Sequence, residues 1–167
     1  MENNPILEFV EKLKFFDEFS DDEKSKLVNT IGIFQKFKDG QTIITEGETG
    51  SSLFVVLTGA VRIAKLMAPN VQDGHISLQE KENVIIADLK AGSIFGEVSL
   101  VSSQPRNTSA IASSKEVVVM KISRENIEKF SLAIQKKFQK QLILILAQRL
   151  DDMNSKYIKL KSSITKG

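Results

Sequence analysis

Hydrophobic and polar positions change their period twice along the chain. In the first 32 residues, apolar side chains recur every three or four positions, the period of a helix that is buried on one side; they include Ile6, Phe9, Val10, Leu13 and Phe16. Ser20 and Glu23 have the spacing of a capping box, which predicts a helix from Ser20 to about Thr30. We therefore expect segment 1–32 to be helical.

From Phe34 the helical period is lost. Short runs of β-branched and aromatic residues follow, separated by turn pairs such as Asp39-Gly40 and Ala91-Gly92. The predicted strands are Phe34–Lys38, Thr42–Thr45, Ser52–Thr58, Ala60–Lys65, Val84–Leu89 and Val117–Ile122. Many short strands with glycine turns favour a small barrel or jelly roll over alternating strands and helices, so segment 33–122 is expected to form such a roll.

Helical periodicity returns in segment 123–167, where a short helix starting at Arg124 precedes a long one. Six apolar residues of the long helix are spaced alternately four and three apart, which is the heptad spacing of a helix–helix seam. They are Leu146, Leu150, Met153, Tyr157, Leu160 and Ile164. The stripe indicates a dimer helix, although a helix packed only on its own domain would show a similar pattern.

The composition is that of a single folded domain over residues 1–167. Hydrophobic residues make up 41% and charged residues 26% of the 167 positions, which argues against disorder. The net charge of +2 is too small to suggest a nucleic-acid partner. The longest apolar run, 142–147, is far too short to span a membrane, and the N-terminal residues do not resemble a signal peptide. We expect a cytoplasmic protein without a membrane or nucleic-acid partner.

Residues that commonly carry catalysis or bind metals are scarce. The chain has one histidine and no cysteine, so clustered metal ligands and disulfides are not expected. His75 lies in a polar stretch of segment 66–82, which resembles an extended hairpin, and we expect it to be exposed to solvent. No nucleophile and base stand in a recognisable arrangement. The sequence therefore predicts a protein that is not an enzyme and has no catalytic residues.

The most specific motif occupies residues 95–110. Gly96 precedes Glu97, and Arg106 follows nine residues later among small polar residues. A carboxylate accepts a hydrogen bond from a sugar hydroxyl, and the planar guanidinium fork fits phosphate oxygens. Gly96 allows close approach of the backbone, and a helix starting near Glu97 would point N–H groups at an anion. The alternative is an ordinary surface ion pair, but arginine is rare here, with 4 arginines against 19 lysines.

This motif resembles the phosphate-binding cassette of cyclic nucleotide-binding domains, and 46–59 resembles the glycine-punctuated strand pair of that family. The resemblance covers roughly residues 5 to 160. It implies a mainly β fold with flanking helices: N-terminal helices, an eight-stranded β-roll (jelly roll) interrupted by the cassette, and a long C-terminal helix. It also implies phosphate and ribose contacts from Gly96, Glu97, Val98, Ser99, Arg106, Asn107 and Thr108. Thr108 departs from the family pattern, in which alanine is common two residues after the arginine.

The resemblance favours cAMP as ligand, with cGMP as the alternative, and implies no metal. In the family, threonine or serine directly after the arginine often accompanies cGMP and alanine accompanies cAMP, but Asn107 is neither. Contacts with the base are expected from the strands and from the long helix. By position they are Ile63, Ile86, Ala87, Arg149 and Asn154.

The same resemblance implies a regulatory role. We expect a non-catalytic module that binds a cyclic nucleotide, dimerises through the long helix, and signals to an effector protein, not identified by the sequence, as that helix moves. Because the chain ends at Gly167, we expect a stand-alone domain without a DNA-binding segment. The alternative is a degenerate, nucleotide-free domain that acts as a dimeric protein-interaction module.

Overall fold

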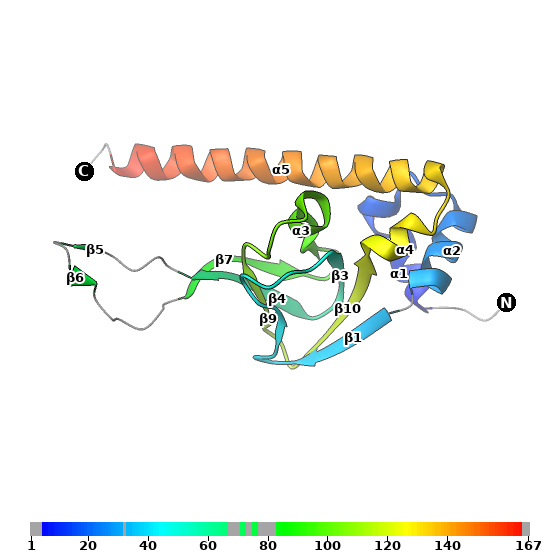
Figure 1. Ribbon diagram of the computed structural model, residues 1–167, viewed down its shortest axis with the longest axis horizontal. Coiled ribbons are helices and arrows are strands. Elements are labelled where there is room, and N and C mark those ends of the chain that lie inside the picture. Colours follow the sequence, from blue (N-terminus) through cyan, green and yellow to red (C-terminus); the bar gives the residue numbers. More distant parts are fainter. Residues whose placement is uncertain (1–4, 32, 67–70, 73–74, 77–82, 165–167) are drawn as a thin grey trace.

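The computed structural model describes residues 5–31, 33–66, 71–72, 75–76 and 83–164. Two antiparallel four-stranded sheets form a jelly roll (Figure 1). In the first sheet the order is β1 (Ile33–Lys38), β10 (Glu116–Ser123), β3 (Ser52–Thr58) and β8 (Ile94–Phe95). In the second it is β2 (Thr42–Ile44), β9 (Ser109–Ala112), β4 (Ala60–Leu66) and β7 (Asn83–Lys90). The predicted fold class is confirmed.

Helices cover one side of the roll. They are α1 (Pro5–Glu11), the 3-10 helix η1 (Lys14–Phe16), α2 (Asp21–Ile31), α3 (Glu97–Ser102), α4 (Arg124–Glu128) and α5 (Leu132–Ile164). In Figure 1, α1, α2 and α4 gather near the start of α5, and α5 runs along the length of the molecule above α3. Within the described ranges, no helix combines the length and apolarity needed to cross a membrane.

Strand β3 is buried on both faces, which explains its unbroken apolar sequence. Leu53, Val55 and Leu57 join a core shared with the helices. Phe54 and Val56, which point to the opposite face, join a second core inside the roll. The side-chain alternation of one strand therefore connects the helical layer to the interior of the roll.

The first half of α5 is anchored by aromatic contacts. The ring of Phe138 is fully buried, and its centroid lies 5.6 Å from that of Phe15, 6.3 Å from that of Phe16 and 5.2 Å from that of Phe19. Aromatic pairs at these separations add to the stability gained by burying their surface. By contrast, the side chains of residues 151–164 are all exposed.

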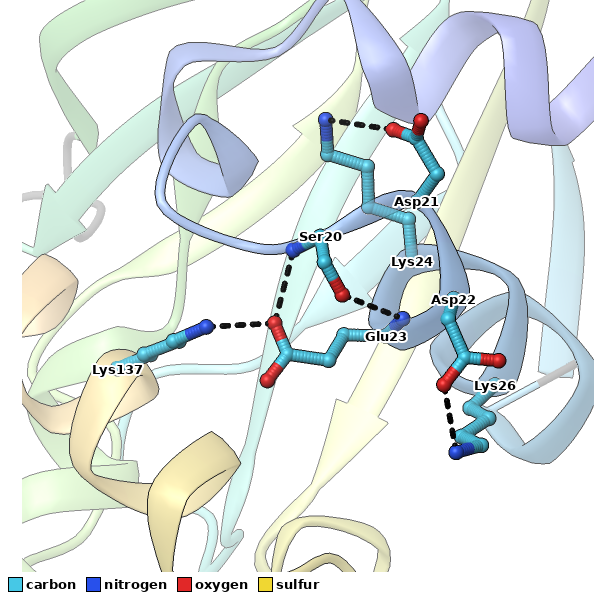
Figure 2. A network of polar contacts seen from close by, with 7 residues as sticks. All are labelled: Ser20, Asp21, Asp22, Glu23, Lys24, Lys26 and Lys137. Carbon is cyan, nitrogen blue, oxygen red and sulfur yellow. Dashed lines mark hydrogen bonds and ion pairs between the residues drawn. The ribbon is translucent and has the colours of Figure 1, made fainter.

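A polar network beside this cluster ties α2 to α5 (Figure 2). The Ser20 amide donates to Glu23 Oε2 at 2.8 Å, and the Glu23 amide donates to Ser20 Oγ at 3.3 Å. These two bonds confirm the predicted capping box, and α2 begins at Asp21. Lys137 of α5 donates to the same carboxylate oxygen at 2.6 Å. Glu23 therefore caps its own helix, α2, and also forms an ion pair with Lys137 of α5.

The structure differs from the sequence prediction where elements are very short. β8 has two residues and β9 only four, three of them small, so neither showed a recognisable alternation. The apolar stripe expected to continue to Phe16 leaves the α-helix after Glu11 and ends in η1. In segment 66–82, β5 (Val71–Gln72) and β6 (His75–Ile76) pair as a hairpin. The predicted exposure of the His75 side chain lies outside the described residues.

Candidate functional site

A pocket of about 760 Å³ lies between the roll and α5. Its floor comes from the interior-facing residues of the second sheet, one end from the start of α3, and its roof from α5. The volume is in the range of pockets that bind small molecules. The pocket contains both charged residues of the 95–110 motif, Glu97 and Arg106.

Arg106 is buried despite its charge, with 6% of its surface exposed. Its Nη1 donates to the Gly96 carbonyl oxygen at 2.8 Å, and its guanidinium carbon lies 5.9 Å from the centre of the Phe54 ring. Burial lowers the pKa of Arg106, an effect opposed by the nearby negative charges of Glu48 and Glu97. The described residues offer it no salt-bridge partner, so its cationic fork is available to an anion in the pocket.

Two glycines make room for this side chain. A Cβ atom on Gly50 would lie 2.8 Å from Arg106 Nη2, and a Cβ on Gly96 would lie 3.0 Å from Arg106 Nη1. Gly96 also has a φ of +78°, in the left-handed region that favours glycine. The sequence motif assigned Gly96 to close approach by a ligand; the structure shows that it also accommodates the arginine.

Glu97 opens α3 and is 1% exposed. Its Oε1 accepts a hydrogen bond from Nη1 of Arg149 on α5, and Arg149 Nη2 donates to the carbonyl oxygen of Ile94. Glu97 Oε2 has no hydrogen-bond partner among the described residues. A buried acceptor without a donor is costly unless something supplies one, so this oxygen is a candidate ligand contact.

The other predicted phosphate and ribose residues surround the same end of the pocket. Val98 and Ser99 lie in the first turn of α3, and Asn107 and Thr108 line the pocket on the strand side. The carbonyl oxygen of Asn107 accepts a hydrogen bond of 2.7 Å from Lys65 Nζ. The structure therefore brings all seven residues of this group together around one cavity.

Of the predicted base contacts, Ile63, Ile86, Ala87 and Arg149 line the pocket. Asn154 does not, because the lining face of this part of α5 is formed by Arg149, Asp152, Met153 and Lys156, and Asn154 lies beyond the edge of that face. Arg149 lines the pocket with its two terminal nitrogens bound to Glu97 and Ile94, so the structure places it beside the start of α3. Ile86 is 48% exposed, which leaves apolar surface for a ligand to cover.

Three charged pocket residues were not predicted from the sequence: Lys65, Asp152 and Lys156. Lys65 was missed because a lysine at the end of a predicted strand is expected to be an ordinary exposed residue. Asp152 and Lys156 share a helix face with Arg149 and Met153, and this i, i+3, i+4, i+7 spacing could have identified them. They lie on the α5 side of the pocket.

Arg124 fastens the other end of α3. Its Nη2 donates to the carbonyl oxygen of Leu100 and, at 2.9 Å, to Ser103 Oγ. Ser103 is the C-cap of α3, with a φ of +58°. Because Arg124 begins α4, which leads into α5, its side chain connects the 95–110 segment to the C-terminal helices.

The residues of the pocket are suited to binding a small ligand. A buried cation, a buried carboxylate and an apolar wall suit a ligand that carries an anion, a hydroxyl and an aromatic or aliphatic surface. Among the described residues, no group of three or more histidine, cysteine, aspartate or glutamate side chains could hold a metal ion.

Comparison with known proteins matches this geometry. Human cGMP-dependent protein kinase 2 is 27% identical over 117 residues, which cover 70% of this chain and 14% of the kinase. A cyclic nucleotide-binding domain from Methylobacillus flagellatus is 28% identical, with a TM-score of 0.72 over 92% of this chain and 80% of that one. The regulatory domain of Toxoplasma gondii PKA, crystallised with cAMP, shares the fold at 21% identity, with a TM-score of 0.64 over 81% of this chain and 47% of that one.

The present chain therefore corresponds to only a small part of that kinase. A family model, the cyclic nucleotide-binding domain, matches residues 34–133. That range includes the roll from β1 onward, the 95–110 segment and the start of α5. The chain belongs to the cyclic nucleotide-binding domain family.

Proposed function

We propose that this chain is a non-catalytic regulatory module that binds a cyclic nucleotide between the roll and α5. The observation that carries the proposal is that two buried residues of opposite charge, Arg106 and Glu97, line the same pocket. Arg106 would bind the phosphate oxygens and Glu97 the ribose 2′-hydroxyl. Asn107, Thr108 and the first turn of α3 would surround the phosphate, with the base against Ile63, Ile86 and Ala87.

The nucleotide is cAMP or cGMP, and different observations favour each. The family resemblance favours cAMP. Asp152 on the pocket wall favours cGMP, because guanine presents two adjacent N–H donors to a carboxylate whereas adenine presents an acceptor at N1. Lys156, four residues later, would donate to the guanine carbonyl oxygen. We retain both as candidates for direct comparison.

The proposed signal is the position of α5. Bound nucleotide would contact α3 and α5 together, so that α5 takes one position with nucleotide and another without it. An effector protein would distinguish these two positions because it binds one of them more tightly. A cytoplasmic location is part of this proposal, since cyclic nucleotides are intracellular signals. The alternative is a nucleotide-free module that acts only through protein contacts.

A homodimer through α5 completes the proposal. Leu150, Met153, Tyr157, Leu160 and Ile164 of the heptad seam are all more than half exposed. A second copy of this helix, in parallel, would cover them by repeating the same spacing. The seam continues past the pocket, since Tyr157, Leu160 and Ile164 do not line it.

Calorimetric titration with cAMP and with cGMP tests the binding function. Arg106→Ala should lower the affinity thirtyfold to several-thousandfold, because losing one partner of a buried charged contact costs about 2–5 kcal/mol. Arg62→Ala is the matched control, since Arg62 pairs with Asp88 on the exposed surface of the roll and should leave binding unchanged. If neither nucleotide gives heat or a thermal shift, the nucleotide-free alternative replaces this proposal.

A further inference from the structure

One arginine joins α5 to both the end of β8 and the start of α3. The fork of Arg149 donates to the carbonyl oxygen of Ile94 through Nη2 and to Oε1 of Glu97 through Nη1. Phe95 and Gly96 lie between Ile94 and Glu97 in the chain, so the fork spans the turn that leads into α3. The Glu97 side chain is 1% exposed and that of Arg149 is 41% exposed.

The two oxygens of the Glu97 carboxylate differ in their hydrogen-bond partners. Arg149 occupies Oε1, while Oε2 is buried without a hydrogen-bond partner among the described residues. An ionised carboxylate accepts hydrogen bonds on both oxygens, so a donor on Oε2 need not displace Arg149. The guanidinium is itself held in place by two acceptors, since Nη2 donates to the Ile94 carbonyl oxygen while Nη1 donates to Oε1.

We infer that Arg149 is a positioning residue for ribose recognition rather than a base contact. It holds the Glu97 carboxylate in place, so that Oε2 accepts the ribose 2′-hydroxyl while Oε1 holds α5. Nucleotide and helix then bind the two oxygens of one carboxylate and stabilise each other's attachment. This inference rests on the proposed function and adds a specific coupling to it.

The charge balance of the site favours this arrangement over simple competition. Were Arg149 displaced by a hydroxyl, a buried carboxylate would exchange a cationic partner for a neutral one, which is unfavourable in a buried site. Arg106 does not replace Arg149, because its Nη1 is bound to the Gly96 carbonyl and its fork is proposed to meet the phosphate. Retaining Arg149 keeps one cation for each anion.

The test combines a change in the protein with a change in the ligand. Wild type and Arg149→Ala are each titrated with the cyclic nucleotide that binds better and with its 2′-deoxy analogue. Arg149→Ala should lower the affinity for the ribonucleotide about tenfold and leave that for the 2′-deoxy analogue within about twofold, because only the former donates to Glu97. Arg149→Lys keeps a donor but not the planar fork. Its affinity for the ribonucleotide should therefore lie between those of wild type and Arg149→Ala, and its affinity for the 2′-deoxy analogue should stay unchanged.

Lys140→Ala is the matched control. It also removes an ion pair from α5, between Lys140 Nζ and Glu18 Oε1 at 2.6 Å, but it lies outside the pocket and should leave both affinities unchanged. Equal losses for the two ligands in Arg149→Ala would overturn the inference in favour of a base or packing role. Tighter ribonucleotide binding in that variant would also overturn it, because Arg149 would then compete with the ribose.

A measurement without ligand separates this inference from the proposed function. Hydrogen exchange of segment 143–156 should accelerate in Arg149→Ala and to the same extent in Glu97→Gln, with no further increase in the double variant. Additive effects would show that the two residues do not act as a unit, which overturns the coupling. Wild type that binds neither nucleotide would instead overturn the proposed function, whatever the exchange result.

Discussion

Arg106 reaches the pocket because its neighbours lack side chains at two positions. Gly50 and Gly96 lie within contact distance of its guanidinium, and the Gly96 carbonyl oxygen accepts one of its hydrogen bonds. A charged side chain incurs a desolvation penalty when buried, and this one is partly offset by Phe54 and by the negative charges nearby. The site therefore depends also on Gly50 and Phe54, which do not line the pocket.

Gly50→Ala tests this dependence. Its φ is not in the left-handed region, so the backbone accepts alanine, but the added Cβ would lie 2.8 Å from Arg106 Nη2. Overpacking of this kind costs about 1–3 kcal/mol, so nucleotide affinity measured by calorimetry should fall about fivefold to 150-fold.

Gly40→Ala provides the contrast. Gly40 has a φ of +79°, and a Cβ atom added there would meet nothing within 4 Å. Alanine should therefore lower the unfolding free energy by about 1 kcal/mol through backbone strain without changing affinity. Unchanged affinity in Gly50→Ala would mean that Arg106 has more freedom than the structure shows.

The sequence was sufficient to identify Glu97 and Arg106, because both lie in one short motif. It was not sufficient for the contacts of Arg149, which is 52 positions from Glu97 and meets it only through the placement of α5. Asn154 is absent from the pocket lining for a similar reason. Residue type and approximate location on a helix do not fix which face meets the pocket, since each position turns the side chain by about 100°.

At the scale of elements, Glu23 is the clearest pH-dependent contact. The hydrogen bond from Lys137, followed by that from the Ser20 amide, lowers the pKa of Glu23 below its ordinary value of 4.5. A lowered pKa in the folded state stabilises the protein above the unfolded-state pKa, and this stability is lost as pH falls through the folded-state pKa. The junction of α2 and α5 should therefore weaken in acid.

Glu23→Gln should lower the unfolding free energy by about 1 kcal/mol at neutral pH, and the difference from wild type should shrink as the pH falls below 4.5. Thermal unfolding at a series of pH values measures this. Asp22→Asn is the control, because Asp22 pairs with Lys26 on the exposed face of the same helix (Figure 2) and such pairs contribute little. A difference for Glu23→Gln that does not depend on pH would contradict the assignment.

The elements differ in how well the sequence predicted them. The capping box, the long helix and the six predicted strands have periodic or capping signals that depend only on nearby residues. β8 and β9 form because β3 and β4 offer them paired neighbours, which local pattern does not encode. The break at Lys12–Leu13 likewise depends on packing of the aromatic cluster rather than on a glycine or proline.

For the whole molecule, the exposed seam of α5 makes a prediction about assembly. Leu160 is 60% exposed and does not line the pocket. Leu160→Glu should shift the protein from dimer to monomer in sedimentation experiments while leaving nucleotide affinity unchanged, because charges facing each other across a seam repel. Lys159→Glu changes charge beside the seam and should remain dimeric. A wild-type protein that is monomeric at every concentration would refute the proposed dimer.

Strand β3 has a consequence for how the molecule folds. Alternate side chains of β3 belong to the helical core and to the core of the roll. Unfolding of either core would therefore displace β3 and disrupt the packing of the other. The two layers should therefore melt in a single cooperative transition, with calorimetric and van't Hoff enthalpies that agree. Residues 151–164, which belong to neither core, would stand outside that transition and fray first in an isolated chain.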